Sequence, residues 1–274
     1  MLSKQAVDRY RRDGYYFPID IMSEVEAHEC RSRLEAYEMR SGGPLSGEFR
    51  HKPHLLFTWL NALVRHPRIL DAVEDVLGPN LLCWNSSFFI KEANDSGFVS
   101  WHQDATYWGL SSPDVSTVWL AFTPANKLNG CMKFIPGSHN TQVAHRDTFH
   151  KDNLLTRGQE IAVEVDENQA VLAELKPGQA SIHHVLLFHG SAPNRSGDRR
   201  IGFAIRYIPT HLRQIAGERD SATLVRGVDD HQNFELEPAP QADFSPEARA
   251  LHAAITQRQV RVLYRGTDRT EYRA

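Results

Sequence analysis

A histidine and an aspartate stand two positions apart in the segment SWHQD, residues 100–104. We expect this segment to be a strand, and alternate residues of a strand face the same side. The imidazole of His102 and the carboxylate of Asp104 would then converge on one point as two metal ligands. A second nitrogen ligand would complete a facial triad of two histidines and one carboxylate, which leaves coordination positions open. The tripeptide alone is weak evidence, because a buried histidine hydrogen-bonded to an aspartate has the same sequence.

A candidate for the third ligand lies further along the chain. A strand-like apolar run covers residues 180–188 and is followed by His189, so we expect this histidine at the end of a strand. His183 and His184 lie on the same expected strand and are alternative ligands. Most of the 14 histidines fall in expected helices or loops, where solvated or capping roles are expected.

Arg200 opens the next expected strand and could neutralise the far carboxylate of a dicarboxylate bound to the metal. Arginine binds a carboxylate through two hydrogen bonds and keeps its charge when buried. Gly202 and Ala204 share its strand face and leave room for such a molecule. Ser191 could donate its hydroxyl to the same carboxylate. The alternative role for Arg200 is a surface salt bridge.

Three motifs occur in the order WHQDATYW, GCMKFIPGSH and HGSAPNRSGDRR. Together they resemble the phytanoyl-CoA dioxygenase family of iron(II) and 2-oxoglutarate oxygenases. The resemblance covers residues 80–209 and extends loosely to the N-terminal RDGYYF. It implies a double-stranded β-helix core (a cupin-like jelly roll), an Fe(II) ion, and 2-oxoglutarate and O2 as cosubstrates.

The family's metal ligands each match a residue of this chain, namely His102, Asp104 and His189. The interval between His189 and Arg200 also agrees with the family, which favours His189 over His183 and His184. In related halogenases a small residue replaces the carboxylate ligand so that chloride can bind iron. Here the position is filled by Asp104, which favours hydroxylation.

The same resemblance implies which residues hold 2-oxoglutarate. The anchoring arginine matches Arg200, and the neighbouring hydroxyl matches Ser191. A tryptophan of the cosubstrate wall matches Trp119, although its spacing from Asp104 needs a gap of one residue. His139, in the PGSH turn, is expected to be structural.

Substrate contacts are expected from residues close to these motifs. Tyr107 and Trp108 follow the metal ligands and could form an apolar lid. Arg206 shares the strand face of Arg200 and could meet an anionic substrate, or could be solvated at the end of the strand. Phe88 belongs to an alternating run that could line the mouth of the barrel or pack in its core; the run is Trp84, Ser86 and Phe88.

The elements that position these residues predict a mainly β fold with flanking helices. A helix capped by Ser3, a helix from Ser23 to Tyr37 with a capping-box spacing, and helices at 66–77 and 245–264 are expected. Short β-rich runs separated by turn residues favour an antiparallel barrel or sandwich. These runs cover residues 80–91, 98–104, 116–123, 131–136, 161–165, 170–174, 180–188 and 200–208.

Length and composition predict one oxygenase domain over residues 1–274, in which 41% of residues are hydrophobic. Residues 1–79 should be mainly helical, 80–209 should form the β core with the metal site, and 210–274 should be an extension with a helix. The net charge of −3, without blocks of like charge, indicates a small-molecule partner rather than nucleic acid or a membrane.

A cytoplasmic location is expected for two reasons. The three cysteines are odd in number and lack CxxC spacing, which argues against a disulfide framework and a thiolate metal site. No apolar leader and no run of about 18 apolar residues occurs.

We therefore expect a dioxygenase that hydroxylates an unactivated C–H bond of a small metabolite or natural-product intermediate and releases succinate and CO2. The same oxidant could instead perform desaturation, epimerisation or ring closure. A cupin-like protein that binds a ligand without catalysis is an alternative of a different class. A zinc hydrolase with the same ligands would lack an obvious general base and would leave Arg200 unexplained.

Overall fold

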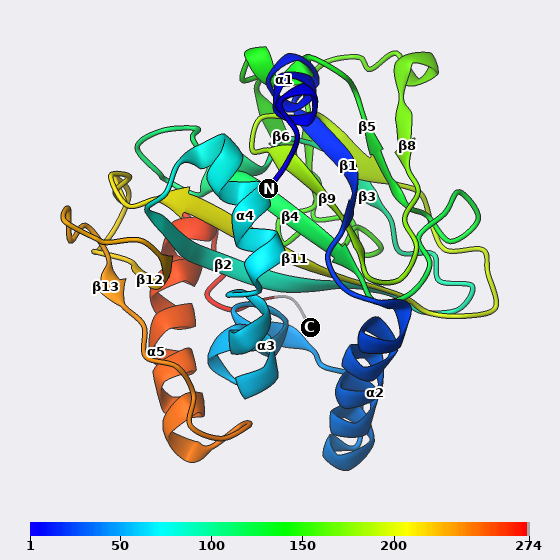
Figure 1. Cartoon of the computed structure of the whole chain (residues 1–274). Helices are drawn as coiled ribbons and strands as arrows, with labels where there is room; N and C mark the ends of the chain where they lie inside the picture. Colours follow the sequence, from blue (N-terminus) through cyan, green and yellow to red (C-terminus); the bar gives the residue numbers. More distant parts are fainter. Residues whose placement is uncertain (273–274) are drawn as a thin grey trace.

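Two β-sheets form the core of the computed structural model, which describes residues 1–272 (Figure 1). The larger sheet has the strand order β1-β9-β4-β11-β2-β12-β13, and the smaller has the order β3-β10-β5-β8. The larger sheet contains β1 (Tyr15–Asp20), β2 (Leu81–Lys91), β4 (Ser116–Ala121), β9 (Gln179–His184), β11 (Arg200–Pro209), β12 (Ser221–Arg226) and β13 (Glu235–Leu236). The remaining strands are β3 (Val99–His102), β5 (Met132–Phe134), β8 (Val171–Ala173) and β10 (His189–Ser191) in the smaller sheet, and the separate pair β6 (His145–Asp147) and β7 (Gln159–Ile161).

Successive strands alternate between the two sheets. β3, β5, β8 and β10 belong to the smaller sheet, whereas β4, β9 and β11 belong to the larger one. Apolar side chains from both sheets, including Trp119, Phe134 and Ala204, pack together in one buried cluster. This alternation is that of a double-stranded β-helix, so the predicted jelly-roll core is confirmed.

Helices flank the larger sheet (Figure 1). They are α1 (Lys4–Asp13), α2 (Glu24–Ser41), α3 (Thr58–Leu63), α4 (Pro67–Leu77) and α5 (Pro246–Leu263). Leu34, Leu60 and Val73 from three of these helices share a buried cluster with Val118 and Phe203 of the sheet. The helices therefore leave the space between the two sheets free for a site.

Helix boundaries follow local sequence signals, as predicted. The Ser3 hydroxyl accepts a hydrogen bond from the Ala6 N–H at 3.2 Å at the start of α1. Ser23 and Glu26 form the expected capping box at the start of α2, which continues past Tyr37 to Ser41. The helices expected at residues 66–77 and 245–264 correspond to α4 and α5.

Strand boundaries differ from the prediction where apolar residues are buried in turns as well as in strands. The expected strand at 180–188 is divided, because β9 ends at His184 and a turn leads to β10. In this turn the Leu187 N–H donates to the His184 carbonyl at 2.9 Å. The prediction of a strand at residues 161–165 is wrong, since only Ile161 lies in β7. The sequence pattern also missed β1, β6, β12 and β13.

The missed strands change the description of both ends of the chain. β1 adds an edge strand to the larger sheet from within the expected helical part, residues 1–79. β12 and β13 extend the opposite edge from within the expected extension, residues 210–274. None of the helices in residues 1–272 is both long enough and apolar enough to cross a lipid bilayer.

Candidate metal and cosubstrate site

The antiparallel pairing of β3 with β10 places His102 directly opposite His189. β3 ends at His102, earlier than expected, and Asp104 begins a short 3-10 helix (Asp104–Tyr107). Gln103 is extended (φ −114°, ψ 141°), so Asp104 keeps the two-residue alternation with His102 despite the end of the strand. The buried Gln103 side chain donates to backbone carbonyls at 2.6 and 2.8 Å, which holds this turn in place.

His102, Asp104 and His189 form a compact group of buried ligand atoms. One ligand atom from each residue lies within 4.8 Å of the other two. Nε2 of His102 is 3.3 Å from Oδ1 of Asp104, and Nε2 of His189 is 4.0 Å from the same oxygen. The described residues, 1–272, contain no second group of this kind. The structure thus brings the three expected ligands around one point.

Backbone carbonyls fix the orientation of both imidazoles. Nδ1 of His102 lies 3.0 Å from the carbonyl oxygen of His189, and Nδ1 of His189 lies 2.9 Å from that of Leu187. A carbonyl oxygen only accepts hydrogen bonds, so each Nδ1 carries the proton. In the neutral ring, Nε2 then carries the lone pair, which is how outer hydrogen bonds prepare a histidine to bind a metal.

The protonation states at the triad suit a divalent cation. Burial lowers the pKa of His189 well below its ordinary value, and the nearby His102 and His183 lower it further. Burial alone would raise the pKa of Asp104, but the hydrogen bond to His102 and the nearby His189 and Arg206 hold it below its ordinary range. A neutral imidazole and an ionised carboxylate are the forms that bind metal.

The alternative ligands His183 and His184 lie on β9, in the other sheet from His189. The His183 ring is 4.7 Å from the His189 ring, centroid to centroid, but neither of its nitrogens has a hydrogen-bond partner among residues 1–272. Burial lowers the pKa of His183 to about 4. The His184 ring accepts a backbone N–H at 3.1 Å. Neither ring belongs to the group of converging ligand atoms.

Arg200 is a buried cation beside the triad, with 1% of its surface exposed. It donates from Nη1 to the Gly130 carbonyl at 2.6 Å, and its Nε has no hydrogen-bond partner in the part of the chain that the structure describes. Burial lowers the pKa of Arg200 to about 10. Within residues 1–272 no carboxylate lies within 4.0 Å of the guanidinium. A buried charge without a counter-ion is costly, so this position suits an anionic ligand.

The other expected cosubstrate residues surround Arg200. The Trp119 ring lies 5.2 Å from the guanidinium carbon. A Cβ on Gly202 would lie 1.8 Å from Trp119 Cζ2, so only glycine leaves space for this indole. Ser191 and Ala204 line the same small cavity as the triad. The structure therefore brings Arg200, Ser191 and Trp119 together, as expected.

Lys91 is a site residue that the sequence reasoning missed. It is fully buried and pairs across the strands with Arg200. Its ammonium group donates to the Ser191 hydroxyl oxygen at 2.7 Å and also to the Ala192 carbonyl. Burial, reinforced by the charge of Arg200, lowers the pKa of Lys91 to about 6. The only signal in the sequence was a lysine at the end of the strand expected at residues 80–91.

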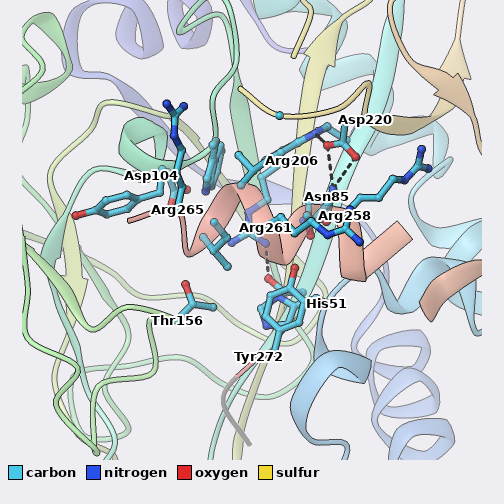
Figure 2. Close-up of a pocket in the computed structure, with 18 of the residues that line it drawn as sticks. His51, Asn85, Asp104, Thr156, Arg206, Asp220, Arg258, Arg261, Arg265 and Tyr272 are labelled. Atoms are coloured by element: carbon cyan, nitrogen blue, oxygen red, sulfur yellow. Dashed lines mark hydrogen bonds between the residues drawn. The ribbon is translucent and has the colours of Figure 1, made fainter. Parts of the chain in front are cut away.

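A cavity of about 480 Å³ adjoins the triad and is shown in Figure 2. Asp104, Phe89 and Arg206 line both this cavity and the small cavity at Arg200. Tyr107 and Trp108 line it as expected, and three of the four expected substrate residues therefore surround one space.

Phe88 is the expected substrate residue that the structure places elsewhere. Its ring lies in the hydrophobic core, 5.1 Å from the Phe203 ring and 6.1 Å from the Phe122 ring. Trp84 is an unpaired extra residue in β2, because Cys83 and Asn85 pair with consecutive residues of β11. Such a bulge reverses the alternation of faces, so Phe89 rather than Phe88 lines the cavity.

A group of two histidines and one carboxylate between the sheets of a double-stranded β-helix is the arrangement of non-haem iron oxygenases with a facial triad. The model of the phytanoyl-CoA dioxygenase (PhyH) family matches residues 10–202, and the chain belongs to this family. The matched span contains the triad, Lys91 and Arg200. The part of the chain after residue 202 lies outside it and includes Arg206 and α5.

Individual relatives agree with this membership. The chain is 31% identical over 159 residues to a probable alpha-ketoglutarate-dependent hypophosphite dioxygenase of Stutzerimonas stutzeri, which covers 57% of this chain and 54% of that protein. The match spans about half the length of such curated relatives. The apo structure of the non-heme monooxygenase ThoJ is 36% identical, with a TM-score of 0.84, over 94% of this chain and 97% of that one. The structure of CytC3 with Fe(II) and alpha-ketoglutarate is 28% identical, with a TM-score of 0.68, over 90% of this chain and 98% of that one.

Proposed function

We propose that this protein is an Fe(II)- and 2-oxoglutarate-dependent dioxygenase that hydroxylates an unactivated C–H bond of a small metabolite or natural-product intermediate. The observation that carries the proposal is the convergence of His102, Asp104 and His189 beside the unpaired, buried Arg200. Family membership and the similarity to CytC3, whose structure contains Fe(II) and alpha-ketoglutarate, support it.

The ligand atoms fit a ferrous ion. Two imidazole nitrogens and one carboxylate oxygen form the mixed set that binds non-haem Fe(II) and leaves positions for a cosubstrate and O2. Both nitrogens are oriented by backbone carbonyls before any metal binds. When bound, Fe(II) and 2-oxoglutarate supply the oxidation of a C–H bond by O2, with release of succinate and CO2.

The surrounding residues would bind and orient 2-oxoglutarate. Arg200 would hold the distal carboxylate through two hydrogen bonds. The Ser191 hydroxyl oxygen already accepts from Lys91, so its own proton is free to donate to the same carboxylate. Trp119 would pack against the carbon chain and exclude water. These contacts position the cosubstrate without taking part in bond cleavage.

Two alternatives make different use of the same residues. Desaturation, epimerisation or ring closure would need the same iron and cosubstrate, and would differ only in how the substrate is held. The alternative of a ligand-binding protein without catalysis does not explain why a metal-binding triad lies beside an arginine that has no carboxylate partner within residues 1–272. Asp104 fills the ligand position that halogenases leave open, so hydroxylation is the preferred outcome.

Succinate formation tests the proposed function. Protein loaded anaerobically with Fe(II) and supplied with 2-oxoglutarate should form succinate when O2 is admitted, and candidate small molecules should accelerate it. Omission of Fe(II) or replacement by Zn(II) should stop the reaction. If the Fe(II)-loaded parent forms no succinate, the alternative of a ligand-binding protein without catalysis is favoured. Hydrolysis of a candidate substrate by the Zn(II)-loaded protein would indicate a hydrolase.

The proposed cellular setting follows from composition. A net charge of −3 supports a small-molecule partner rather than nucleic acid. Cys30, Cys83 and Cys131 are free, which supports a reducing, cytoplasmic location. We also propose that residues 1–274 act as one oxygenase domain. Fractionation of cells that express the protein would test its location.

A further inference from the structure

A second buried arginine, Arg206, stands where the triad meets the 480 Å³ cavity (Figure 2). It is 7% exposed and lies on β11, on the same face as Arg200. Nη1 of Arg206 donates to the Ser87 hydroxyl and, at 3.5 Å, to the Ala204 carbonyl. Its Nε has no hydrogen-bond partner, and in the described part of the chain no carboxylate lies within 4.0 Å of its guanidinium.

The cavity around Arg206 offers aromatic surface at close range, and its acidic neighbour Asp104 belongs to the converging group of metal ligands and lies more than 4.0 Å from the guanidinium. The guanidinium carbon lies 5.6 Å from the Phe89 ring and 5.8 Å from the Trp108 ring. Asp220, a buried carboxylate in the same cavity, accepts hydrogen bonds from Trp84 Nε1 at 2.7 Å and from Gln259 Nε2 at 3.1 Å. Asp220 is therefore satisfied by its own neighbours and is not the partner of Arg206.

The formal charges of the triad, the cosubstrate and Arg200 cancel without Arg206. Fe(II) carries two positive charges, Asp104 one negative charge and 2-oxoglutarate two, so these groups sum to one negative charge. Arg200 cancels that charge. Arg206 adds one positive charge to this group, which does not include Asp220 and the other charged residues further along the cavity, and no carboxylate of the described residues lies within 4.0 Å of its guanidinium. A buried charge without a partner is strongly unfavourable.

We propose that Arg206 binds an acidic group of the substrate, so that the substrate class is organic acids with a largely apolar body. This inference rests on the proposed function above and names the substrate of the same site. The acidic group, a carboxylate or another oxyanion, would accept hydrogen bonds from the outer nitrogens of Arg206. The body would pack against Trp84 and Trp108 in a cavity of the size that small-molecule ligands occupy.

Matched acid and amide pairs test the inference directly. The probes are 3-phenylpropionate, indole-3-acetate and hexanoate, each compared with its own amide. Binding to the anaerobic complex of protein, Fe(II) and 2-oxoglutarate is measured by calorimetry, which needs no turnover. The parent should bind at least one acid about tenfold or more tightly than its amide, because only the acid pairs with the guanidinium.

Variants assign that preference to Arg206. Arg206→Gln should remove the difference between acid and amide, and Arg206→Lys should keep part of it, since lysine retains the charge but not the fork of donors. Arg146→Gln, which removes an exposed arginine paired with Glu160, is the control and should behave like the parent. The parent comparison stands even if Arg206→Gln does not fold.

Two results would overturn the inference. One is a parent that shows no preference for any acid, including one that binds none of the probes. The other is an Arg206→Gln protein that keeps the acid preference and instead loses affinity for 2-oxoglutarate, which would assign Arg206 to the cosubstrate. Succinate formation is measured separately. If the protein forms succinate but shows no preference for acids, only this inference is refuted. If it forms no succinate, the proposed function is refuted.

Discussion

Lys91 and Arg200 lie directly opposite each other on neighbouring strands, and neither cation meets a carboxylate within residues 1–272. Lys91 donates to the Ser191 hydroxyl, and burial together with the Arg200 charge lowers the pKa of Lys91 to about 6. A protonated Lys91 and Arg200 would repel each other, which contributes to the lowered pKa of Lys91. A dianionic cosubstrate would relieve that repulsion, so the strand pairing itself prepares an anion site.

Lys91→Met should weaken 2-oxoglutarate binding without affecting iron. In this variant the Ser191 hydroxyl no longer accepts the hydrogen bond from Lys91, and the amine that could become charged near the distal carboxylate of 2-oxoglutarate is removed. We expect a loss of about 1–2 kcal/mol, or a rise of roughly 5- to 30-fold in KM for 2-oxoglutarate. Lys133→Met is the control, because Lys133 forms a surface pair with Glu167. Equal KM values for the two variants would contradict the role of Lys91.

The same lysine should make stability depend on pH. Burial lowers the pKa of Lys91 to about 6, against 10.5 in the unfolded chain. Between these values the unfolded chain holds a proton that the folded protein lacks, so the free energy of unfolding rises with pH. The destabilisation that the buried Lys91 causes has its full size below pH 6 and disappears as the pH approaches 10.5. Lys91→Met should therefore stabilise the metal-free protein at pH 7, by an amount that shrinks towards pH 10. Urea unfolding at several pH values measures this; a constant difference would refute it.

The sequence was sufficient for features that depend on local spacing. His102 and Asp104 converge because Gln103 is extended, even though β3 ends at His102. Arg200 and Gly202 share a face because β11 is a regular strand at this point. Capping residues such as Ser23 likewise set helix boundaries through contacts within one turn.

Features that depend on register between distant segments could not be predicted. Lys91 becomes a site residue only through its pairing with Arg200 across β2 and β11. Phe88 and Phe89 exchange roles because Trp84 forms a bulge, and both faces of β2 are buried, so polarity does not reveal the change. The position of Arg206 between two cavities depends in the same way on distant segments, because Ser87 of β2 accepts its hydrogen bond and residues of α5 line the larger cavity.

Iron binding should require His102, Asp104 and His189 together. Alanine at each position removes a ligand, and the loss of affinity should exceed the roughly 10–100-fold that changes to outer hydrogen bonds cost. His183→Ala and His184→Ala are matched controls, since both histidines are buried or half-buried nearby but lie outside the converging group. Anaerobic Fe(II) titration of the five variants measures this. Near-parental affinity in all three ligand variants would rule out the site.

Asp104→Gly should abolish hydroxylation while opening a coordination position. The carboxylate is buried, and Thr117 lies 3.3 Å from its second oxygen. Removing it leaves space for an external anion at the metal, so chloride should bind the Fe(II)-loaded variant more tightly than the parent. Calorimetric chloride titration and product analysis test both statements. Unchanged hydroxylation by this variant would show that Asp104 is not a ligand.

In the proposed function Arg200 would be the residue that commits the protein to 2-oxoglutarate, because the triad alone is shared with other iron enzymes. Arg200→Ala would leave the distal carboxylate buried and unpaired, at a cost of roughly 3–5 kcal/mol, or about 10² to 10³ in apparent affinity for 2-oxoglutarate. Iron binding should survive, since Arg200 touches no ligand atom. Arg200→Lys should be intermediate, because lysine cannot form two parallel hydrogen bonds.

Arg199 provides the matched control for this experiment. It precedes Arg200 but points to the other side, where it pairs with Glu38 at 2.7 Å and Glu92 at 2.8 Å. Arg199→Ala should therefore lower stability slightly and leave the cosubstrate affinity unchanged. The measurement is the dependence of succinate production on 2-oxoglutarate in the parent and the three variants at fixed Fe(II) and O2. If the large loss appears in Arg199→Ala, the anchor is misassigned; if no variant changes the dependence, 2-oxoglutarate is not the cosubstrate.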